Sequence, residues 1–293
     1  FLEWNDKFRD SVRGYWLRKG PASGRGEFAR RITASSDAFH HGQRAPWASV
    51  NFVAVHDGYT LADTTRYEAK HNLANGEENR DGRDQELARN FGVEGETQDA
   101  TILCARKRTQ RAMLATLLLS QGTPMLCAGD EIGKTQRGNN NAYCQDNDTS
   151  WLDWEASDRE LRDFVQHVIG VRKSEPMLRS ATWLHAHRQP GPGVAVAWHL
   201  PNGQAMQHHD WHDTGQDAFA CSLVAEGHAE LRLLFNPDGA PVDFEVAGMW
   251  TVLIDSADVA VQAQLTVKDH HCVQSGALLV LKSVQETPHV RPQ

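Results

Sequence analysis

The sequence predicts an α/β fold followed by a small antiparallel β-sandwich. Residues 1–178 alternate short apolar runs with amphipathic segments, a pattern typical of βαβ units and a parallel sheet. Residues 179–293 instead contain short β-rich segments, separated by turns such as 201–203 ("PNG") and 236–239 ("NPDG"). We therefore expect two domains, an α/β domain over 1–178 and a β-sandwich domain over 179–293.

The candidate strands of the α/β part are three apolar runs: "FLEW" at 1–4, "NFVAVHD" at 51–57 and "TPMLCAGDE" at 123–131. Residues 52–55 are mostly β-branched or aromatic and predict a strand that is buried on both faces. The second and third runs end in acidic residues, at Asp57 and at Asp130-Glu131. Because parallel strands place their carboxyl ends at one edge of a sheet, we expect a functional site there.

Helices are predicted between and after these runs. The first follows a cap at Asn5 or Asp6, the second spans about 99–120 with a cap at Asp99, and the last spans about 158–174. Apolar residues recur at helical spacing in each segment, so each helix should pack one face against the core.

Composition limits the possible classes of partner. The 293-residue chain has a formal net charge of -8 and no long basic block, which argues against nucleic acid or an anionic membrane. No apolar run approaches the roughly 20 residues that span a bilayer. The five cysteines lack regular spacing and fit reduced thiols, so we expect a cytoplasmic location. Phe1 already lies in a strand-like run, which suggests the later part of a longer chain.

Two long polar inserts follow the second and third runs. The first, at about 66–97, is rich in Asn, Gly and acidic residues, and inserts of this length are usually functional or disordered. It does not fit a calcium loop, because Ala88 occupies the position of the closing glutamate. The second, at about 134–154, combines asparagines at 139–141 with aromatic residues, as carbohydrate sites require. The alternative is that these residues only cap turns and fill the core.

Histidine clusters raise the hypothesis of a metal site. His208 and His212, in the stretch "HHDWHD", have the spacing of two ligands on one helical face. That stretch lies in a β-rich region and lacks the glutamate of a metalloprotease motif. We therefore interpret these as surface histidines and expect neither a metal nor a cofactor.

Several motifs together resemble one enzyme family. The stretches "NFVAVHDG", "KHNLANGEENRDG", "NFGVEG", "LLLSQGTPMLCAGDEIGKTQRGNNNAYCQDN" and "WLDW" occur in this order along the chain. They closely resemble the isoamylase-type glycogen debranching enzymes of the α-amylase superfamily of glycoside hydrolases. The resemblance covers residues 1–178, and it extends to the β-rich remainder only by position.

The resemblance implies a fold, an activity and a set of site residues. The first part would contain the sixth, seventh and eighth strands of a (β/α)8 TIM barrel. The enzyme would be a glycosidase that cleaves the α-1,6 branch linkages of glycogen, limit dextrin or another branched α-glucan with retention. Asp57 would be the catalytic residue that stabilises the transition state through the 2- and 3-hydroxyls of the sugar. The candidate substrate-binding residues are His56, Asn72, Asp130, Glu131, Asn139, Asn140, Asn141 and Tyr143.

The sequence also departs from the family pattern. The contexts of the family's nucleophilic Asp and general-acid Glu, which would lie on the fourth and fifth barrel strands, do not occur in these residues. We therefore expect a carboxyl-terminal part of such a hydrolase, whose partner is the amino-terminal part of the same enzyme. The alternative is a non-catalytic carbohydrate-binding or interaction module, because ancestry and activity are separate questions.

Overall fold

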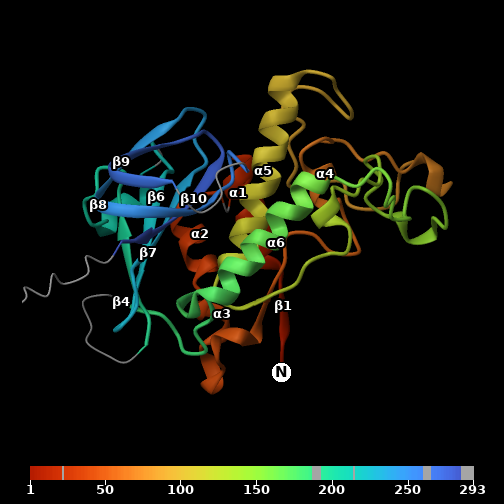
Figure 1. Cartoon of the computed structure of the whole chain (residues 1–293). Helices are drawn as coiled ribbons and strands as arrows, with labels where there is room; N and C mark the ends of the chain where they lie inside the picture. Colours follow the sequence, from red (N-terminus) through yellow and green to blue (C-terminus); the bar gives the residue numbers. More distant parts are fainter. Residues whose placement is uncertain (22, 187–192, 214, 260–264, 285–293) are drawn as a thin grey trace, which may run out of the picture.

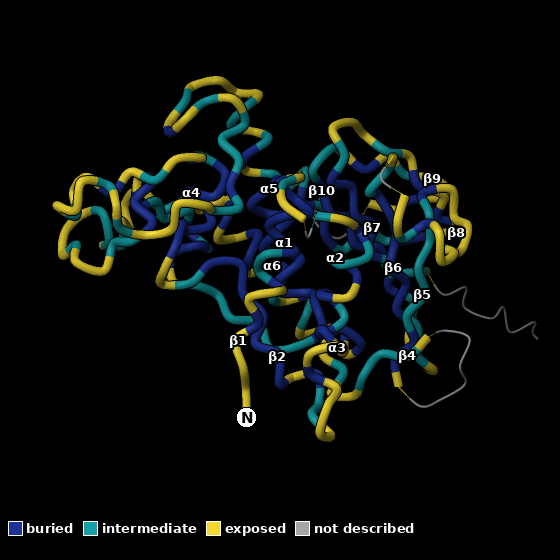
Figure 2. The backbone as a smooth tube through the Cα atoms, turned by 180° about the vertical axis from the view of Figure 1, so that it is seen from behind, coloured by how far each residue is buried: buried dark blue, intermediate teal, exposed yellow. Residues whose placement is uncertain are grey.

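The fold contains two separate sheets, one small and one large. Helices lie between the larger sheet and the two inserts. The computed structural model describes residues 1–21, 23–186, 193–213, 215–259 and 265–284. Figure 1 shows the larger, C-terminal sheet on one side of the helices and the inserts on the other. Figure 2 shows that the helices and strands are largely buried, whereas much of the inserts is exposed. In the described residues, no helix is long and apolar enough to cross a membrane.

The smaller sheet is parallel and consists of short strands. Strand β2 (Ser49–Asn51) pairs with β1 (Glu3–Asn5) on one side and with β3 (Thr123–Pro124) on the other. The predicted parallel pairing of the first, second and third runs is therefore confirmed. The predicted lengths of the second and third runs are wrong, because residues 52–57 and 125–131 leave the ladder. Residues 52–54 are nevertheless buried, as the sequence predicts.

The three predicted helices are confirmed, together with the predicted caps at Asn5 and Asp99. Helix α1 (Asp6–Leu17) begins after Asn5, whose side chain accepts a hydrogen bond from the Phe8 backbone N–H. Asp99 and Asp158 cap α5 (Ala100–Leu119) and α6 (Arg159–Ser174) in the same way. Three shorter helices were not predicted: α2 (Arg25–Ile32), α3 (Ser36–Phe39) and α4 (Leu61–Thr64). The single-turn 3-10 segments are η1 (His41–Gln43), η2 (Pro46–Ala48), η3 (Leu73–Asn75), η4 (Asp130–Ile132), η5 (Ala142–Cys144), η6 (Pro176–Arg179) and η7 (His208–His212).

The larger sheet has the strand order β4-β5-β6-β7-β10-β8-β9, and all its pairs are antiparallel except β4 with β5. Its strands are β4 (His185–Ala186), β5 (Ala195–His199), β6 (Phe219–Val224), β7 (Leu231–Asn236), β8 (Val242–Asp255), β9 (Thr266–Val273) and β10 (Ala277–Ser283). The β-rich second part is thus confirmed. The described strands form one hydrogen-bonded sheet, so the division into two packed layers stays a prediction.

Both faces of this sheet are apolar. On one face, Phe219 and Phe235 join the main core and contact Phe28 of α2 at ring-centroid distances of 6.1 and 5.2 Å. On the other face, side chains such as Leu234 and Leu279 form a second buried cluster with residues of β8 and β9. The main core is therefore continuous between the helices of the first part and the strands of the second.

Candidate active site

His56 and Asp57 lie on an exposed segment just beyond the parallel strand β2. Both side chains are exposed, and the His56 ring meets the Trp4 ring edge-on at a centroid distance of 5.9 Å. An Asp57 carboxylate oxygen, Oδ2, accepts a hydrogen bond of 3.2 Å from Nη2 of Arg83, which belongs to the first insert. The acidic end of the second run and the first insert are thus brought together, as the sequence predicts.

Arg13 of α1 fixes the segment that carries His56 and Asp57. The Arg13 side chain is buried, and its guanidinium donates to the carbonyl oxygens of Val53 at 2.6 Å and Tyr59 at 3.3 Å. It also forms an ion pair of 3.1 Å with the Glu86 carboxylate, which is itself buried. Arg13 therefore holds both ends of the segment at once, and its hydrogen bond to Val53 replaces the strand pairing that ends at Asn51.

Gly58, next to Asp57, provides room for this arrangement. Its φ of +94° lies in the region that favours glycine, and a Cβ there would stand 2.7 Å from Oε1 of Glu86. Its backbone N–H donates to the carbonyl oxygen of Asn140 in the second insert at 3.0 Å. The turn after Asp57 thus contacts residues from both inserts.

Paired asparagines join the two inserts to each other. Asn72 donates from Nδ2 to Oδ1 of Asn140 at 2.8 Å, and the Asn140 backbone N–H donates back to Oδ1 of Asn72 at 3.0 Å. Both side chains are buried. A side chain at Gly82 would collide with them, since its Cβ would lie 2.2 Å from Oδ1 of Asn140. The inserts therefore form one folded unit.

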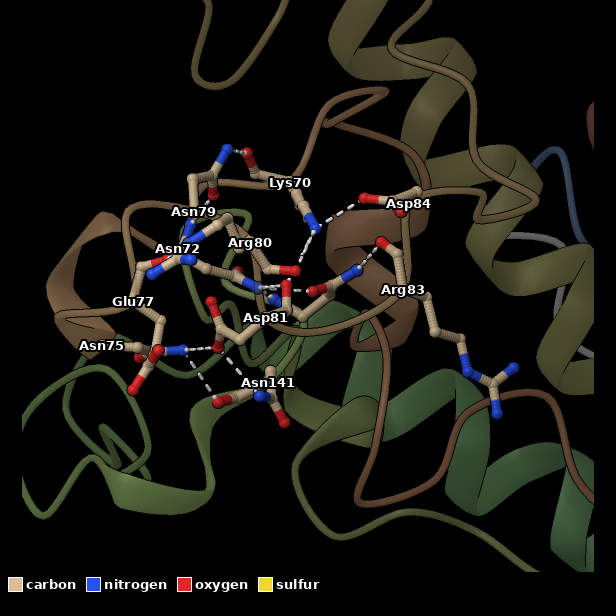
Figure 3. A network of polar contacts seen from close by, with 11 residues as sticks. Lys70, Asn72, Asn75, Glu77, Asn79, Arg80, Asp81, Arg83, Asp84 and Asn141 are labelled. Carbon is tan, nitrogen blue, oxygen red and sulfur yellow. Dashed lines mark hydrogen bonds and ion pairs between the residues drawn. The ribbon is translucent and has the colours of Figure 1, made fainter.

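A carboxylate is placed at the rim of this unit. Asp81 Oδ2 accepts hydrogen bonds from Nδ2 of Asn75 at 2.7 Å and Nδ2 of Asn141 at 2.8 Å (Figure 3). Both bonds lower the pKa of the Asp81 carboxyl, and the bond from Asn75 has the largest effect. Asp81 is therefore held ionised beside amides from both inserts.

Comparison with known proteins identifies relatives of this chain by sequence. A Mycobacterium tuberculosis protein called "Glycogen operon protein GlgX homolog" is 41% identical over 308 residues, a match that covers 96% of this chain and 42% of the relative. A "Glycogen debranching enzyme" of Pectobacterium atrosepticum is 43% identical over 257 residues, covering 88% of this chain and 34% of that enzyme. The chain is homologous to the glycogen debranching enzymes. It spans less than half the length of these curated relatives, and no family model matches it.

Pullulanases are among the solved structures with a similar fold. The enzyme from Bacillus acidopullulyticus matches with a TM-score of 0.68 at 18% identity, covering 96% of this chain and 30% of that one. A pullulanase from Anoxybacillus sp. LM18-11, solved with maltotetraose, matches with a TM-score of 0.64 at 20% identity, covering 97% and 35% of the two chains. The debranching-enzyme homologue thus has an α-amylase-type fold with a β-rich part.

The predicted substrate-binding residues of this debranching-enzyme homologue fall into exposed and buried groups. His56 and Tyr143 are exposed, and Asn141 is half-buried. Asn72, Asn139 and Asn140 are buried, and their amides bond to protein groups within and between the inserts. In this structure they shape the inserts, and direct contact with a sugar stays a prediction for them.

Asp130 and Glu131 lie on the turn η4, which follows β3. Asp130 is buried and accepts a hydrogen bond of 3.0 Å from the Leu61 backbone N–H. Burial raises the pKa of its carboxyl to about 7, although Leu61 and the charge of Arg13 oppose the shift. The Glu131 carboxylate accepts a hydrogen bond from the Gly129 N–H at 2.9 Å. Contact of either residue with substrate stays a prediction.

Sequence reasoning missed two residues that position the site. Arg13 has a recognisable signal, since it is a charged residue beside the apolar stripe of α1. Asp63 of α4 has none. Its buried carboxylate accepts hydrogen bonds from the Thr135 hydroxyl and, at 2.7 Å, from the Gln136 N–H, and so holds the start of the second insert.

The histidine pair of the metal hypothesis lies away from this site. His208 and His212 are exposed on η7, with ring centroids 5.4 Å apart. The described residues contain no group of three or more His, Cys, Asp or Glu side chains placed to hold a metal ion.

Proposed function

We propose that this chain is part of a glycoside hydrolase that cleaves α-1,6-glucosidic branch linkages of glycogen or limit dextrin. The observation that carries the proposal is the exposed Asp57 at the carboxyl-terminal side of a parallel strand, facing an insert that reaches back to it through Arg83. Homology to the glycogen debranching enzymes supports the same reaction.

Asp57 would act by electrostatic stabilisation. Glycosidase transition states resemble oxocarbenium ions, and hydrogen bonds to the sugar 2-hydroxyl strengthen as the charge develops. A carboxylate whose backbone is fixed by Arg13 needs no reorganisation at that moment. Arg83 pairs with this carboxylate, and sugar hydroxyls would take its place.

The two carboxyl groups that break the bond would come from the part of the enzyme that corresponds to the rest of the longer relatives. A retaining glycosidase needs a nucleophilic carboxylate and a carboxylic acid about 5 Å apart. We propose that β1, β2 and β3 are the sixth to eighth strands of a (β/α)8 barrel. The fifth strand, with the acid, would then pair with β1, and the fourth strand, with the nucleophile, would pair with the fifth. Residues 1–178 would then form the partial barrel and 179–293 a β-sandwich domain.

The two inserts would form the wall that recognises branched glucan. The second insert carries the strongly exposed aromatic side chains Tyr143, Trp151 and Trp154, which can stack on sugar rings. The amide pairs that join the inserts would keep these aromatic platforms in a fixed place. The five cysteines are free thiols, which supports the proposed cytoplasmic location.

A second candidate is a non-catalytic carbohydrate-binding or interaction module. It is favoured by the lack of the family's nucleophile and acid contexts in these residues. The deciding experiment compares glycogen limit dextrin hydrolysis by a longer chain, carrying this segment and both missing carboxyls, with that of its Asp57→Asn variant. Loss of turnover with retained fold supports the hydrolase, whereas unchanged turnover overturns it.

A further inference from the structure

A groove of about 590 Å³ lies between helix α2, strand β5 and the turn η7. It shares no lining residue with the 52–58 segment or with the inserts. In Figure 1, α2 lies beside the larger sheet, while α4 and the inserts lie on the other side of α5. The groove is therefore separate from the candidate active site. Side chains relevant to ligand binding come from all three elements: Glu27, Arg30, Trp198, His208, Trp211 and His212.

A buried arginine connects two walls of the groove, helix α2 and the turn η7. Arg25 of α2 donates from Nε to the carbonyl oxygen of Asp210 on η7 at 2.6 Å, and its side chain is only 2% exposed. On η7 itself, the Asp210 carboxylate accepts from the Gln207 N–H at 2.6 Å in a capping box. Gly26 of α2 faces this turn, since a Cβ there would stand in van der Waals contact with the carbonyl oxygen of Trp211, at 3.4 Å. The turn that carries Trp211 and the histidines is thus held against α2.

Two indole rings form the apolar part of the groove. Trp198 and Trp211 meet edge to face, with centroids 5.4 Å apart and an interplanar angle of 83°. Both rings rest on Phe219, at centroid distances of 5.8 and 6.2 Å. The rings are half-buried, so the core fixes their orientation while part of each lines the groove.

Planar polar groups of both signs surround the indoles. His208 and His212 are exposed, with ring centroids 5.4 Å apart. On the α2 side, Glu27 pairs with Arg31 at 2.8 Å and with Arg30 at 3.4 Å, which holds its carboxylate in place. The groove therefore offers hydrogen-bond donors and acceptors beside an aromatic surface, without a strong net charge.

We propose that this groove binds a linear chain of α-linked glucose units without cleaving it. The apolar face of a glucose ring can stack on an indole, while its hydroxyls need fixed donors and acceptors at the edge. The net charge of -8 and the mixed signs in the groove disfavour a polyanion. The proposal rests on the proposed function, because a branched glucan has many chain ends that two sites could bind at once. Such double attachment raises the effective concentration of the polymer at the active site.

The test is electrophoresis of the 293-residue chain through native gels that contain increasing amounts of glycogen, with maltoheptaose as competitor. The first variant is Trp198→Ala, which removes one of the two indoles. The second is the double variant His208→Ala/His212→Ala, and these two imidazoles are exposed, so they can be removed without opening the core. His209→Ala is the matched control, because His209 is exposed on the same turn but does not line the groove. Asp57→Ala reports on binding at the candidate active site.

We expect glycogen to retard the parent chain, and both groove variants to bind at least tenfold more weakly, whereas His209→Ala binds as the parent does. Retardation that is unchanged in both groove variants would overturn the proposal, and a loss confined to Asp57→Ala would place glucan at the candidate active site instead. A parent chain that glycogen does not retard would also overturn the groove. The proposed hydrolysis would be unaffected by either result, since it is measured separately by turnover of the longer chain.

Discussion

Arg13 Nε donates a 2.6 Å hydrogen bond to the carbonyl oxygen of Val53, which lies 40 residues away in sequence. The same guanidinium bonds to Tyr59 O and pairs with Glu86, so one buried side chain holds both ends of the segment that carries Asp57. A buried cation of this kind is costly unless it is fully paired, and its pairing here fixes the backbone of the proposed catalytic carboxylate.

Replacing Arg13 with Met should destabilise the chain by about 3–5 kcal/mol, because Glu86 would be left as an unpaired buried charge. Urea unfolding of the parent chain and the variant measures this loss. The control is Arg13→Met/Glu86→Leu, which removes both charges and should recover part of the stability. If the double variant were destabilised by the sum of the effects of Arg13→Met alone and Glu86→Leu alone, the two residues would not act as a pair.

Local signals in the sequence predict the three longest helices, α1, α5 and α6, and miss the shorter α2, α3 and α4. Asn5, Asp99 and Asp158 are side chains that cap a helix within three residues of themselves, so their effect is visible in a short window. The extent of β2 is different. Residues 52–55 have the composition of a buried strand and are largely buried, but their hydrogen-bonding partner is a distant arginine side chain. Composition predicts burial there, and it does not specify the partner.

The candidate site shows the same division. Asp57 and the two inserts are predicted to lie together, and Arg83 and Asn140 confirm this through contacts with the 57–58 turn. The reciprocal bonds of Asn72 with Asn140 span 68 residues, so no local pattern indicates that these polar side chains are buried. The burial of Asp130 has a similar cause, since its carboxylate bonds to Leu61, 69 residues away.

Asp57→Asn should lower kcat by about a hundredfold to a thousandfold or more in a longer chain that carries this segment and both missing carboxyls. The amide retains the shape of the side chain but loses the charge, which is typically worth about 3 kcal/mol or more. His56→Ala should cost less, on the order of tenfold to a thousandfold, because His56 would also support ground-state binding. Reducing-end assays on limit dextrin measure both variants. Near-normal debranching by Asp57→Asn would contradict the assigned role.

Shortening the first insert within 66–97 should lower debranching more than it lowers thermal stability in the same longer chain. The shortened stretch is the part around Asn72, which joins the second insert through Asn140. Glu86 and Phe91 are kept, because Glu86 pairs with Arg13 and Phe91 packs against the main core, so the core should stay packed. Activity per folded molecule and the melting temperature are the two measurements. If stability collapsed while activity per folded molecule stayed constant, the insert would be structural.

Asp130 should give the chain a pH-dependent stability. Its pKa is raised from 3.8 to about 7 by burial, so the folded state binds a proton more tightly than the unfolded state does. Its contribution is therefore fully present below about pH 4 and is lost as the pH rises through about 7. The loss amounts to at most about 1.4 kcal/mol for each pH unit that separates the folded-state pKa from the unfolded-state pKa.

Urea unfolding between pH 4 and pH 8 tests this effect through the difference between the parent chain and Asp130→Asn. The stability of the parent relative to the variant should fall as the pH rises over that interval and then level off. The exposed Asp57→Asn substitution is the control, since it removes a carboxylate that is not buried. A parent-to-Asp130→Asn difference that stays constant with pH would exclude a buried proton on Asp130.

The 293-residue chain should hydrolyse no glucan on its own. A retaining glycosidase cannot break its bond without a nucleophile and a proton donor, and Asp57 alone has no bond-breaking step to assist. The exposed aromatic side chain of Trp4, on the strand β1 at one edge of the three-stranded sheet, also favours self-association of the isolated segment.

Incubation of this chain with glycogen limit dextrin, followed by measurement of reducing ends, tests that expectation. The matched control is Asp57→Ala, which removes the one carboxylate that resemblance assigns to the reaction and keeps every other residue. Parent and control should release the same background amount. Release by the parent above that control would require a nucleophile and an acid within these residues, and the proposed placement of both groups on other strands would then be wrong.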